Sequence, residues 1–202
     1  MKSIITIGRQ FGCGGKDISK KLSEQLNIPF YDRELIEYVA NKDGVSADIL
    51  EQYDEKATNS LLYSLSVSSC SYIGVTSSAP ILPLNDRLFI SQSEIINDFA
   101  KNGPCIILGR CSDYVLRERD DVLNVFVHCD IDIRTSNIEK RFGIPASKAK
   151  ELIKKTDKRR SAYYNYYTHQ KWGDINNFDL AINSKIGIDN VVETIKNLYK
   201  TL

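Results

Sequence analysis

The sequence predicts a single α/β domain in which helices cover both faces of a mostly parallel sheet. Short apolar segments alternate with amphipathic ones along the chain, an order typical of βαβ units with right-handed crossovers. The 202 residues, 42% hydrophobic and 26% charged, are enough for one domain with a sizeable core. No internal repeat or long linker divides the sequence. We therefore expect one domain over residues 1–202, with excursions at residues 45–85 and 145–175.

The strand candidates are short apolar segments. The first covers residues 3–7 and is rich in β-branched side chains, which suits a strand buried on both faces. Further candidates follow at residues 28–31, 105–108, 122–128 and 178–183.

Helices are predicted where apolar residues recur every three or four positions. Ile18, Leu22 and Leu26 form one such stripe directly after the first strand. The same period predicts helices over residues 86–102, 133–142, 147–167 and 191–198, with shorter ones near residues 35–43 and 46–50.

Composition and charge exclude several classes of protein. The net charge of +1 argues against a polycation that coats nucleic acid. The five cysteines contain no Cys-x-x-Cys pair, which indicates reduced thiols of a cytoplasmic protein rather than disulfides or a zinc site. Residues 57–85 carry no charge but are too rich in Ser, Thr and Asn for a membrane-spanning helix. We expect a cytoplasmic monomer or homodimer without a membrane partner.

A glycine-rich run, residues 8–17, separates the first strand from the first helix. Glycines let backbone N–H groups approach phosphate oxygens, the helix start adds partial positive charge, and Lys16 adds a full one. The usual pattern G-x-x-x-x-G-K-[ST] is matched incompletely, because Gln10 replaces the first glycine and Asp17 replaces the hydroxyl. A glycine-rich turn with no ligand is the alternative interpretation. Cys13 lies in this run at a helix start, where thiol pKa values tend to fall, which would allow oxidative control. The favoured interpretation is a small residue that the loop tolerates.

Two arginines follow strand candidates at the edge where open α/β sheets bind ligands. Arg33 lies in the segment Asp32-Arg33-Glu34 after the second strand, and Arg110 follows Gly109 after the third. Together they could bind a second phosphate bidentately, whereas each alone is typical of a surface residue.

The late helix pattern is strongly basic. Residues 148–171 hold eight basic and two acidic residues, a local charge of +6. Lys158, Arg159 and Arg160 could close over a triphosphate as a lid, and a solvated helix face is the alternative. Tyrosines interleave with these charges, and the four-residue spacing of Tyr163 and Tyr167 favours packing against the core over stacking on nucleic-acid bases.

Six short motifs in order give the sequence a family resemblance. They are ITIGRQFG at 5–12, GGK at 14–16, PFYD at 29–32, ILGRC at 107–111, TDKRR at 156–160 and FDLAIN at 178–183. With these motifs the chain resembles the cytidylate kinase-like family, a branch of the P-loop nucleoside monophosphate kinases. The resemblance implies a three-layer fold with a five-stranded parallel sheet, an acceptor-binding insert at residues 45–85 and a lid at residues 145–175.

The resemblance also implies ATP with Mg²⁺ as the phosphoryl donor. Lys16 and the backbone of residues 12–15 (Gly12, Cys13, Gly14 and Gly15) would surround its β and γ phosphates, and Asn183-Ser184 would lie near its base. Arg33 and Arg110 would hold the acceptor, and Lys158, Arg159 and Arg160 would lie in the lid. True cytidylate kinases carry an aspartate where this chain has Leu108, so selection of cytosine does not follow.

We therefore expect in-line phosphoryl transfer from ATP to a nucleoside monophosphate or a similar phosphate-bearing small molecule. Lys16, Arg110, Arg159 and Arg160 are the candidate catalytic residues. Because Mg²⁺ prefers oxygen ligands, Asp17 is the first candidate for holding the metal, with Asp32 as the alternative or as a base that orients the acceptor. An Asp17 that only stabilises the first turn of its helix is the other interpretation left open. A nucleotide-binding regulator without catalysis is the first rival interpretation, and a nucleic-acid-binding module is a distant second.

Overall fold

The computed structural model describes residues 3–32 and 84–201, and its centre is a five-stranded, all-parallel sheet in the order β2-β3-β1-β4-β5. The strands are β1 (Ile4–Arg9), β2 (Phe30–Tyr31), β3 (Cys105–Leu108), β4 (Val122–His128) and β5 (Leu180–Asn183). This sheet confirms the predicted fold class, and every strand candidate coincides with an observed strand. Arg33 and residues 45–83 of the predicted insert lie outside the described residues.

The first strand is the middle of the sheet. It pairs with β3 from Ile4 opposite Cys105 to Ile7 opposite Leu108, and with β4 as far as Arg9 opposite Val127. Since all strands are parallel, their carboxyl ends meet at one edge, and the glycine-rich run leaves the sheet at that edge.

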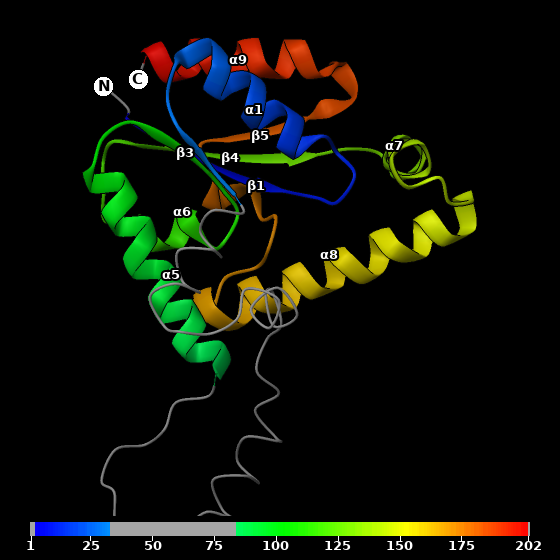
Figure 1. Ribbon diagram of the computed structural model, residues 1–202, viewed down its shortest axis with the longest axis horizontal. Helices are drawn as coiled ribbons and strands as arrows, with labels where there is room; N and C mark the ends of the chain where they lie inside the picture. Colours follow the sequence, from blue (N-terminus) through cyan, green and yellow to red (C-terminus); the bar gives the residue numbers. More distant parts are fainter. Residues whose placement is uncertain (1–2, 33–83, 202) are drawn as a thin grey trace, which may run out of the picture.

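Helices cover both faces of the sheet, which makes three layers (Figure 1). The helices α1 (Gly15–Leu26) and α9 (Ile188–Thr201) lie on one face, and α5 (Leu84–Lys101) and α6 (Ser112–Val115) lie on the other. The β-strand alternation decides which side chains meet which helices, because neighbouring residues of a strand point to opposite faces. Ile5 and Ile7 pack with Leu22 of α1, whereas Ile4 packs with Ile96 of α5.

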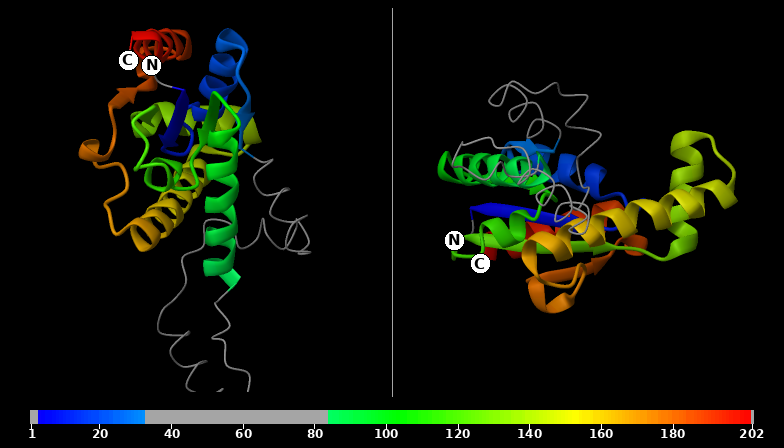
Figure 2. Two further views of the ribbon diagram at one scale, coloured as in Figure 1. Left: turned by 90° about the vertical axis from the view of Figure 1, so that its left-hand side faces the viewer. Right: turned by 90° about the horizontal axis from the view of Figure 1, so that it is seen from below.

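Two further helices extend beyond one end of the sheet. They are α7 (Ile131–Phe142) and α8 (Ala146–Thr168), and Figure 2 shows α8 running from α7 back beneath the sheet toward α5. The C-terminal half of α8 is held there by aromatic side chains, since Tyr163 and Tyr164 are buried and Tyr167 stacks on Phe89 of α5 at 4.1 Å between ring centroids. Packing is therefore the observed role of these tyrosines, as their spacing predicted.

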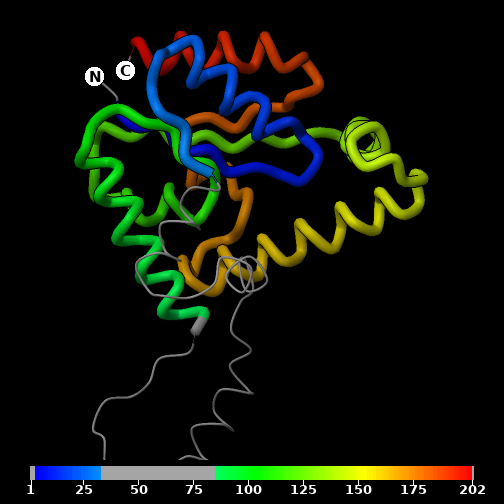
Figure 3. The backbone as a smooth tube through the Cα atoms, in the orientation of Figure 1, coloured from blue at the N-terminus to red at the C-terminus, as the bar shows by residue number. Residues whose placement is uncertain are grey.

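The short helices were not predicted from the sequence. The helix α6 and the 3-10 turns η1 (Ile175–Asn177) and η2 (Ser184–Ile186) are each too short to show an apolar period. The two ends of the described chain meet beside α9 (Figure 3), where the Tyr199 hydroxyl donates to the Ser3 carbonyl at 3.2 Å. Among the helices that the structure describes, none combines the length and apolarity needed to cross a membrane.

Candidate active site

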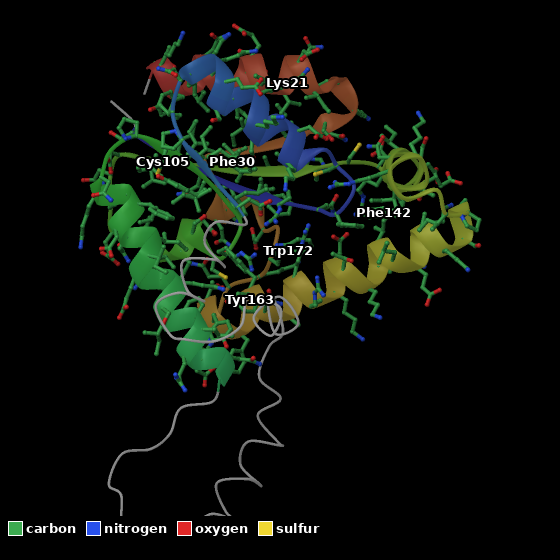
Figure 4. The ribbon with its side chains drawn as sticks, viewed as in Figure 1. Lys21, Phe30, Cys105, Phe142, Tyr163 and Trp172 are labelled. Carbon is green, nitrogen blue, oxygen red and sulfur yellow. The ribbon has the colours of Figure 1, made fainter. Side chains whose placement is uncertain are left out.

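An open cleft of about 860 Å³ lies at the carboxyl edge of the sheet, in the volume range of small-molecule sites. The glycine-rich run forms its floor, the ends of β2 and β3 form one side, and α7 and α8 form the other. Figure 4 labels Phe142, which lines this cleft at the end of α7, Tyr163 on α8, and Trp172 between the sheet and α8. The cleft thus gathers residues that are more than 140 positions apart in the sequence.

The glycine-rich run forms a tight loop between β1 and α1. Gly12 has a φ of +83°, and a Cβ on it would lie 3.0 Å from the carbonyl oxygen of Arg134, so α7 leaves room there only for glycine. The helix begins at Gly15, and its N-cap residue Gly14 makes no side-chain hydrogen bond to the first turn within the described structure. A helix start without a side-chain cap favours an anion through its dipole, although the Gly15 N–H already contacts the Cys13 sulfur.

Cys13 is the loop residue that points away from the cleft. Its side chain is buried, its thiol donates weakly to the Val127 carbonyl at 3.5 Å, and burial raises its pKa to about 11. The loss of solvent outweighs the favourable backbone contact and nearby arginines, so the helix start does not lower the pKa of this thiol. The buried side chain agrees with the favoured interpretation of Cys13 as a small residue that the loop tolerates. Only the backbone of Cys13 remains a candidate for phosphate binding.

Lys16 and Asp32 face each other across the cleft. The Lys16 ammonium lies 3.2 Å from the Asp32 carboxylate, which is only 18% exposed, at the end of β2. Asp17 follows on the exposed side of α1 and also lines the cleft. The structure thus places one lysine and two carboxylates where the sequence predicted the phosphates and the metal.

Arg110 occupies the end of β3 in an unusual conformation. It has a φ of +62°, and it is 8% exposed. Burial lowers the pKa of its guanidinium, Tyr163 and Asp32 oppose that change, and the like charge of Arg160 adds to it. A buried cation that faces another cation is a site with affinity for an anion.

The basic helix α8 supplies Arg159 and Arg160 to the cleft. The Arg160 guanidinium donates to the Arg9 carbonyl at 3.3 Å and lies over the Phe11 ring, 5.5 Å from its centroid. Lys158 is exposed on the same helix and is not part of the described cleft lining.

Asn183 lies at the end of β5 and is not among the described residues that line the cleft. Its side chain accepts a hydrogen bond from the Lys185 backbone at 3.0 Å and begins η2. Its place near a donor base stays a prediction.

The charge of the cleft is strongly positive. Among the described residues, seven basic and two acidic side chains line it, namely Arg9, Lys16, Arg110, Lys140, Arg141, Arg159 and Arg160 against Asp17 and Asp32. The whole chain has a net charge of only +1, so positive charge is concentrated at this edge of the sheet. Such a field attracts polyphosphate ligands and stabilises charge that develops on them.

Sequence reasoning missed Arg9 and the residues of α7. The Arg9 side chain lies against two glycines. A Cβ added at Gly15 would come within 2.9 Å of this side chain, and one added at Gly109 would come within 1.8 Å of it. From α7, Asn137 donates to the Gly12 carbonyl at 2.8 Å. The signal for Arg9 was its place at the end of the first strand, whereas nothing local marks Asn137.

A second, smaller cavity of about 30 Å³ is lined by Arg110. Asp113 of α6 lines it together with Tyr164, whose hydroxyl donates to the Asp113 carboxyl at 2.6 Å. Burial raises the pKa of Asp113, and the hydrogen bond from Tyr164 opposes that change only in part. This cavity has room for about one water molecule rather than for a nucleotide.

The fold and the site define a class of protein. A parallel sheet whose first strand leads through a glycine-rich loop and a lysine into a helix, at the floor of a basic cleft, is the architecture of the P-loop kinases. The family model described as "Cytidylate kinase-like family" matches residues 4–186, and the chain belongs to that family. A comparison with curated protein sequences gave no significant match.

Solved structures agree with this class. A crystal structure of an uncharacterized protein from Eubacterium ventriosum aligns with a TM-score of 0.74 and 26% identity over 100% of both chains. A shikimate kinase from Bacteroides thetaiotaomicron aligns with a TM-score of 0.54 and 12% identity over 98% of both chains. A shikimate kinase from Acinetobacter baumannii aligns with a TM-score of 0.52 and 11% identity over 100% of this chain and 94% of the other. The two kinases show that the fold is shared.

Proposed function

We propose that this protein transfers a phosphoryl group from ATP to a nucleoside monophosphate or a similar phosphate-bearing small molecule. The observation that carries the proposal is the cleft itself, in which Lys16 and the glycine loop meet Asp32 and Arg110 at one edge of the sheet. Phosphoryl transfer requires little covalent chemistry from the protein, so positioning and charge neutralisation account for most of the catalysis.

The donor phosphates bind in this proposal at the start of α1. The backbone N–H of Gly14 and the ammonium of Lys16, which line the cleft, contact the β and γ phosphates. Lys16 is 52% exposed, so its ammonium can turn from Asp32 toward an incoming phosphate. Arg159 and Arg160 approach the same space from α8 and neutralise the charge on the transferred group.

The carboxylates fit a magnesium ion. Asp17 and Asp32 both line the cleft, and Mg²⁺ in phosphoryl-transfer sites is held by one or two carboxylates and by substrate phosphates. Within the described residues no cluster of three or more metal-ligating side chains occurs, so the substrate phosphates complete the ligand set in this proposal. The ion would supply charge neutralisation on the phosphates.

The acceptor binds on the side of Arg110 in this proposal. The buried guanidinium at the end of β3 faces Arg160 and Asp32, which suits a phosphate between the arginines and a polar group on the carboxylate. The predicted partner Arg33 lies outside the described residues, and its role stays a prediction.

The experiment is ATP consumption against a panel of nucleoside monophosphates and sugar phosphates, with wild type and Lys16→Ala. We expect one acceptor class to stimulate ATP use, and a loss of about 10²–10³-fold in rate for Lys16→Ala because a cation directed at developing charge is removed. Lys20→Ala is the matched control, since Lys20 is exposed on the same helix and does not line the cleft. Full activity of Lys16→Ala would contradict the assignment of the donor site.

A nucleotide-binding regulator without catalysis is the second candidate. Leu108 favours it, because this position is fully packed in the core where cytidylate kinases are expected to place a carboxylate. Tight ATP binding by wild type, lost in Lys16→Ala, with no turnover for any acceptor of the panel would support the regulator over the kinase.

A further inference from the structure

The helix α8 and the glycine loop share a carboxylate. Asp157 of α8 accepts a hydrogen bond from the Phe11 backbone N–H at 2.8 Å and another from the Arg134 guanidinium of α7 at 2.5 Å. The same guanidinium donates to the Phe11 carbonyl at 3.3 Å. Both backbone groups of Phe11 are therefore bound by the two helices.

This contact is shielded from solvent. The side chain of Arg134 is 10% exposed and that of Asp157 is 17% exposed. An ion pair at such a depth is costly to break, because each separated charge would stay in a poorly solvated place. The contact therefore resists opening far more than the ion pairs on the surface of the same helices do.

Neighbouring residues hold the loop in the same way. Asn137, one turn after Arg134, binds the Gly12 carbonyl, and Arg160, one turn after Asp157, binds the Arg9 carbonyl. Asp157 and Arg160 share a face of α8 because they are three residues apart. A helix that is bound to the loop at Asp157 thus also fixes where Arg160 enters the cleft.

We propose that Asp157 is a positioning residue that joins α8 to the glycine loop, so that the loop and the cleft-lining arginines of α8 are already arranged before a nucleotide binds. On this view the middle of α8 is a fixed wall of the cleft and not a lid that closes over the donor. The inference rests on the proposed function only for its effect on nucleotide affinity, and the fixed arrangement itself is a property of the free protein.

The test uses Asp157→Asn with Asp132→Asn as the matched control. Asp132 of α7 also forms an ion pair with α8, to Lys150 at 3.2 Å, but it is 85% exposed, and among the described contacts it makes no hydrogen bond to the glycine loop. Both variants therefore remove one carboxylate charge from the α7–α8 pair, and only Asp157→Asn changes the contact with Phe11.

Hydrogen exchange of the protein without nucleotide is the first readout. We expect Asp157→Asn to speed amide exchange in residues 9–12 and 155–161 by about 10-fold or more, because an amide can accept only one of the two hydrogen bonds and carries no charge for the other. Asp132→Asn should leave these segments unchanged. Unchanged exchange in Asp157→Asn would overturn the proposal. This readout does not require the protein to bind ATP, so it stays decisive if the proposed function fails.

Nucleotide affinity is the second readout. We expect the Kd for ATP, and the KM for ATP where turnover is found, to rise about 10-fold in Asp157→Asn. A purely structural role would lower thermal stability and leave the Kd for ATP unchanged, which would contradict the proposal.

Wild-type protein provides a check that needs no variant, in case Asp157→Asn does not fold. A fixed wall predicts that amide exchange in residues 150–163 is the same with and without ATP and Mg²⁺, while residues 11–17 become protected when the nucleotide binds. If ATP instead slows exchange along residues 150–163, this helix closes as a lid and the proposal is wrong.

Discussion

Gly109→Ala tests whether Arg9 belongs to the anion site. A Cβ at residue 109 would lie 1.8 Å from Nη1 of Arg9 and 3.0 Å from its Cζ, so the guanidinium must leave its position over the end of β3. The φ of Gly109 is +77°, and an alanine in this region costs about 1–2 kcal/mol. The variant therefore combines a backbone penalty with the displacement of a cation that lines the cleft.

Gly143→Ala separates these two effects. Gly143 ends α7 with a φ of +64°, and a Cβ there would have no atom within 4 Å. We expect both variants to lose about 1–2 kcal/mol of unfolding free energy, which for a chain of this size lowers the Tm by about 2–8 °C. Only Gly109→Ala should also weaken ATP binding, by about 10-fold, because a charged hydrogen-bond donor is moved.

Thermal unfolding and isothermal titration with ATP and Mg²⁺ measure the two effects. In an Arg9→Ala background, Gly109→Ala should cause no further loss of ATP affinity, since the side chain that it displaces is already absent. The reasoning is refuted if Gly109→Ala binds ATP as tightly as Gly143→Ala does, or if its effect persists undiminished without Arg9.

Two further predictions concern buried titratable groups. Burial raises the pKa of Asp113. The contribution of this group to the free energy of unfolding is therefore complete at a pH below the pKa of the unfolded state, and it is lost as the pH rises through the pKa of the folded state. Asp113→Asn should therefore be more stable than wild type at pH 8, and the Tm difference should shrink toward pH 4; a difference that is constant with pH would contradict this. The raised pKa of Cys13, about 11, predicts a thiolate fraction at pH 7.5 about 100-fold below that of an ordinary thiol. Iodoacetamide followed by site-resolved mass spectrometry should leave Cys13 unmodified in the native protein and label it after denaturation, and rapid native labelling would show the opposite.

Much of the fold was predictable because its signals are local. The apolar first strand, the glycines and the stripe Ile18, Leu22 and Leu26 fix β1, the loop and α1 within about ten residues of one another. Lys16 and Arg110 could be placed for the same reason, since a parallel sheet brings the carboxyl ends of its strands to one edge. The two short turns and α6 escaped prediction because a single helical turn has no period to detect.

The contacts of the site were less predictable because they join distant parts of the chain. Asp157 and Phe11 are 146 residues apart, and Arg134 is 23 residues from Asp157. In the sequence both charged residues look like members of solvated helix faces, and only the packing of α7 against α8 brings them onto the loop. The raised pKa of the Cys13 thiol was not predictable for a related reason, because burial depends on the tertiary fold and not on the helix start.

The same distant contacts explain how a loop that departs from the usual pattern keeps its shape. Gln10 replaces the first glycine, and its side chain accepts a hydrogen bond from the Cys129 N–H at 3.1 Å while its own N–H donates to the Val127 carbonyl. The loop is thus bound to the end of β4 on one side and to Asp157 on the other. In the common motif, eight consecutive residues determine the conformation of the loop. In this protein, contacts with β4, α7 and α8 help to determine it. A substitution in those elements should therefore disturb the loop conformation as strongly as a substitution inside the loop. A loop whose conformation depended on its local sequence alone would not respond in this way.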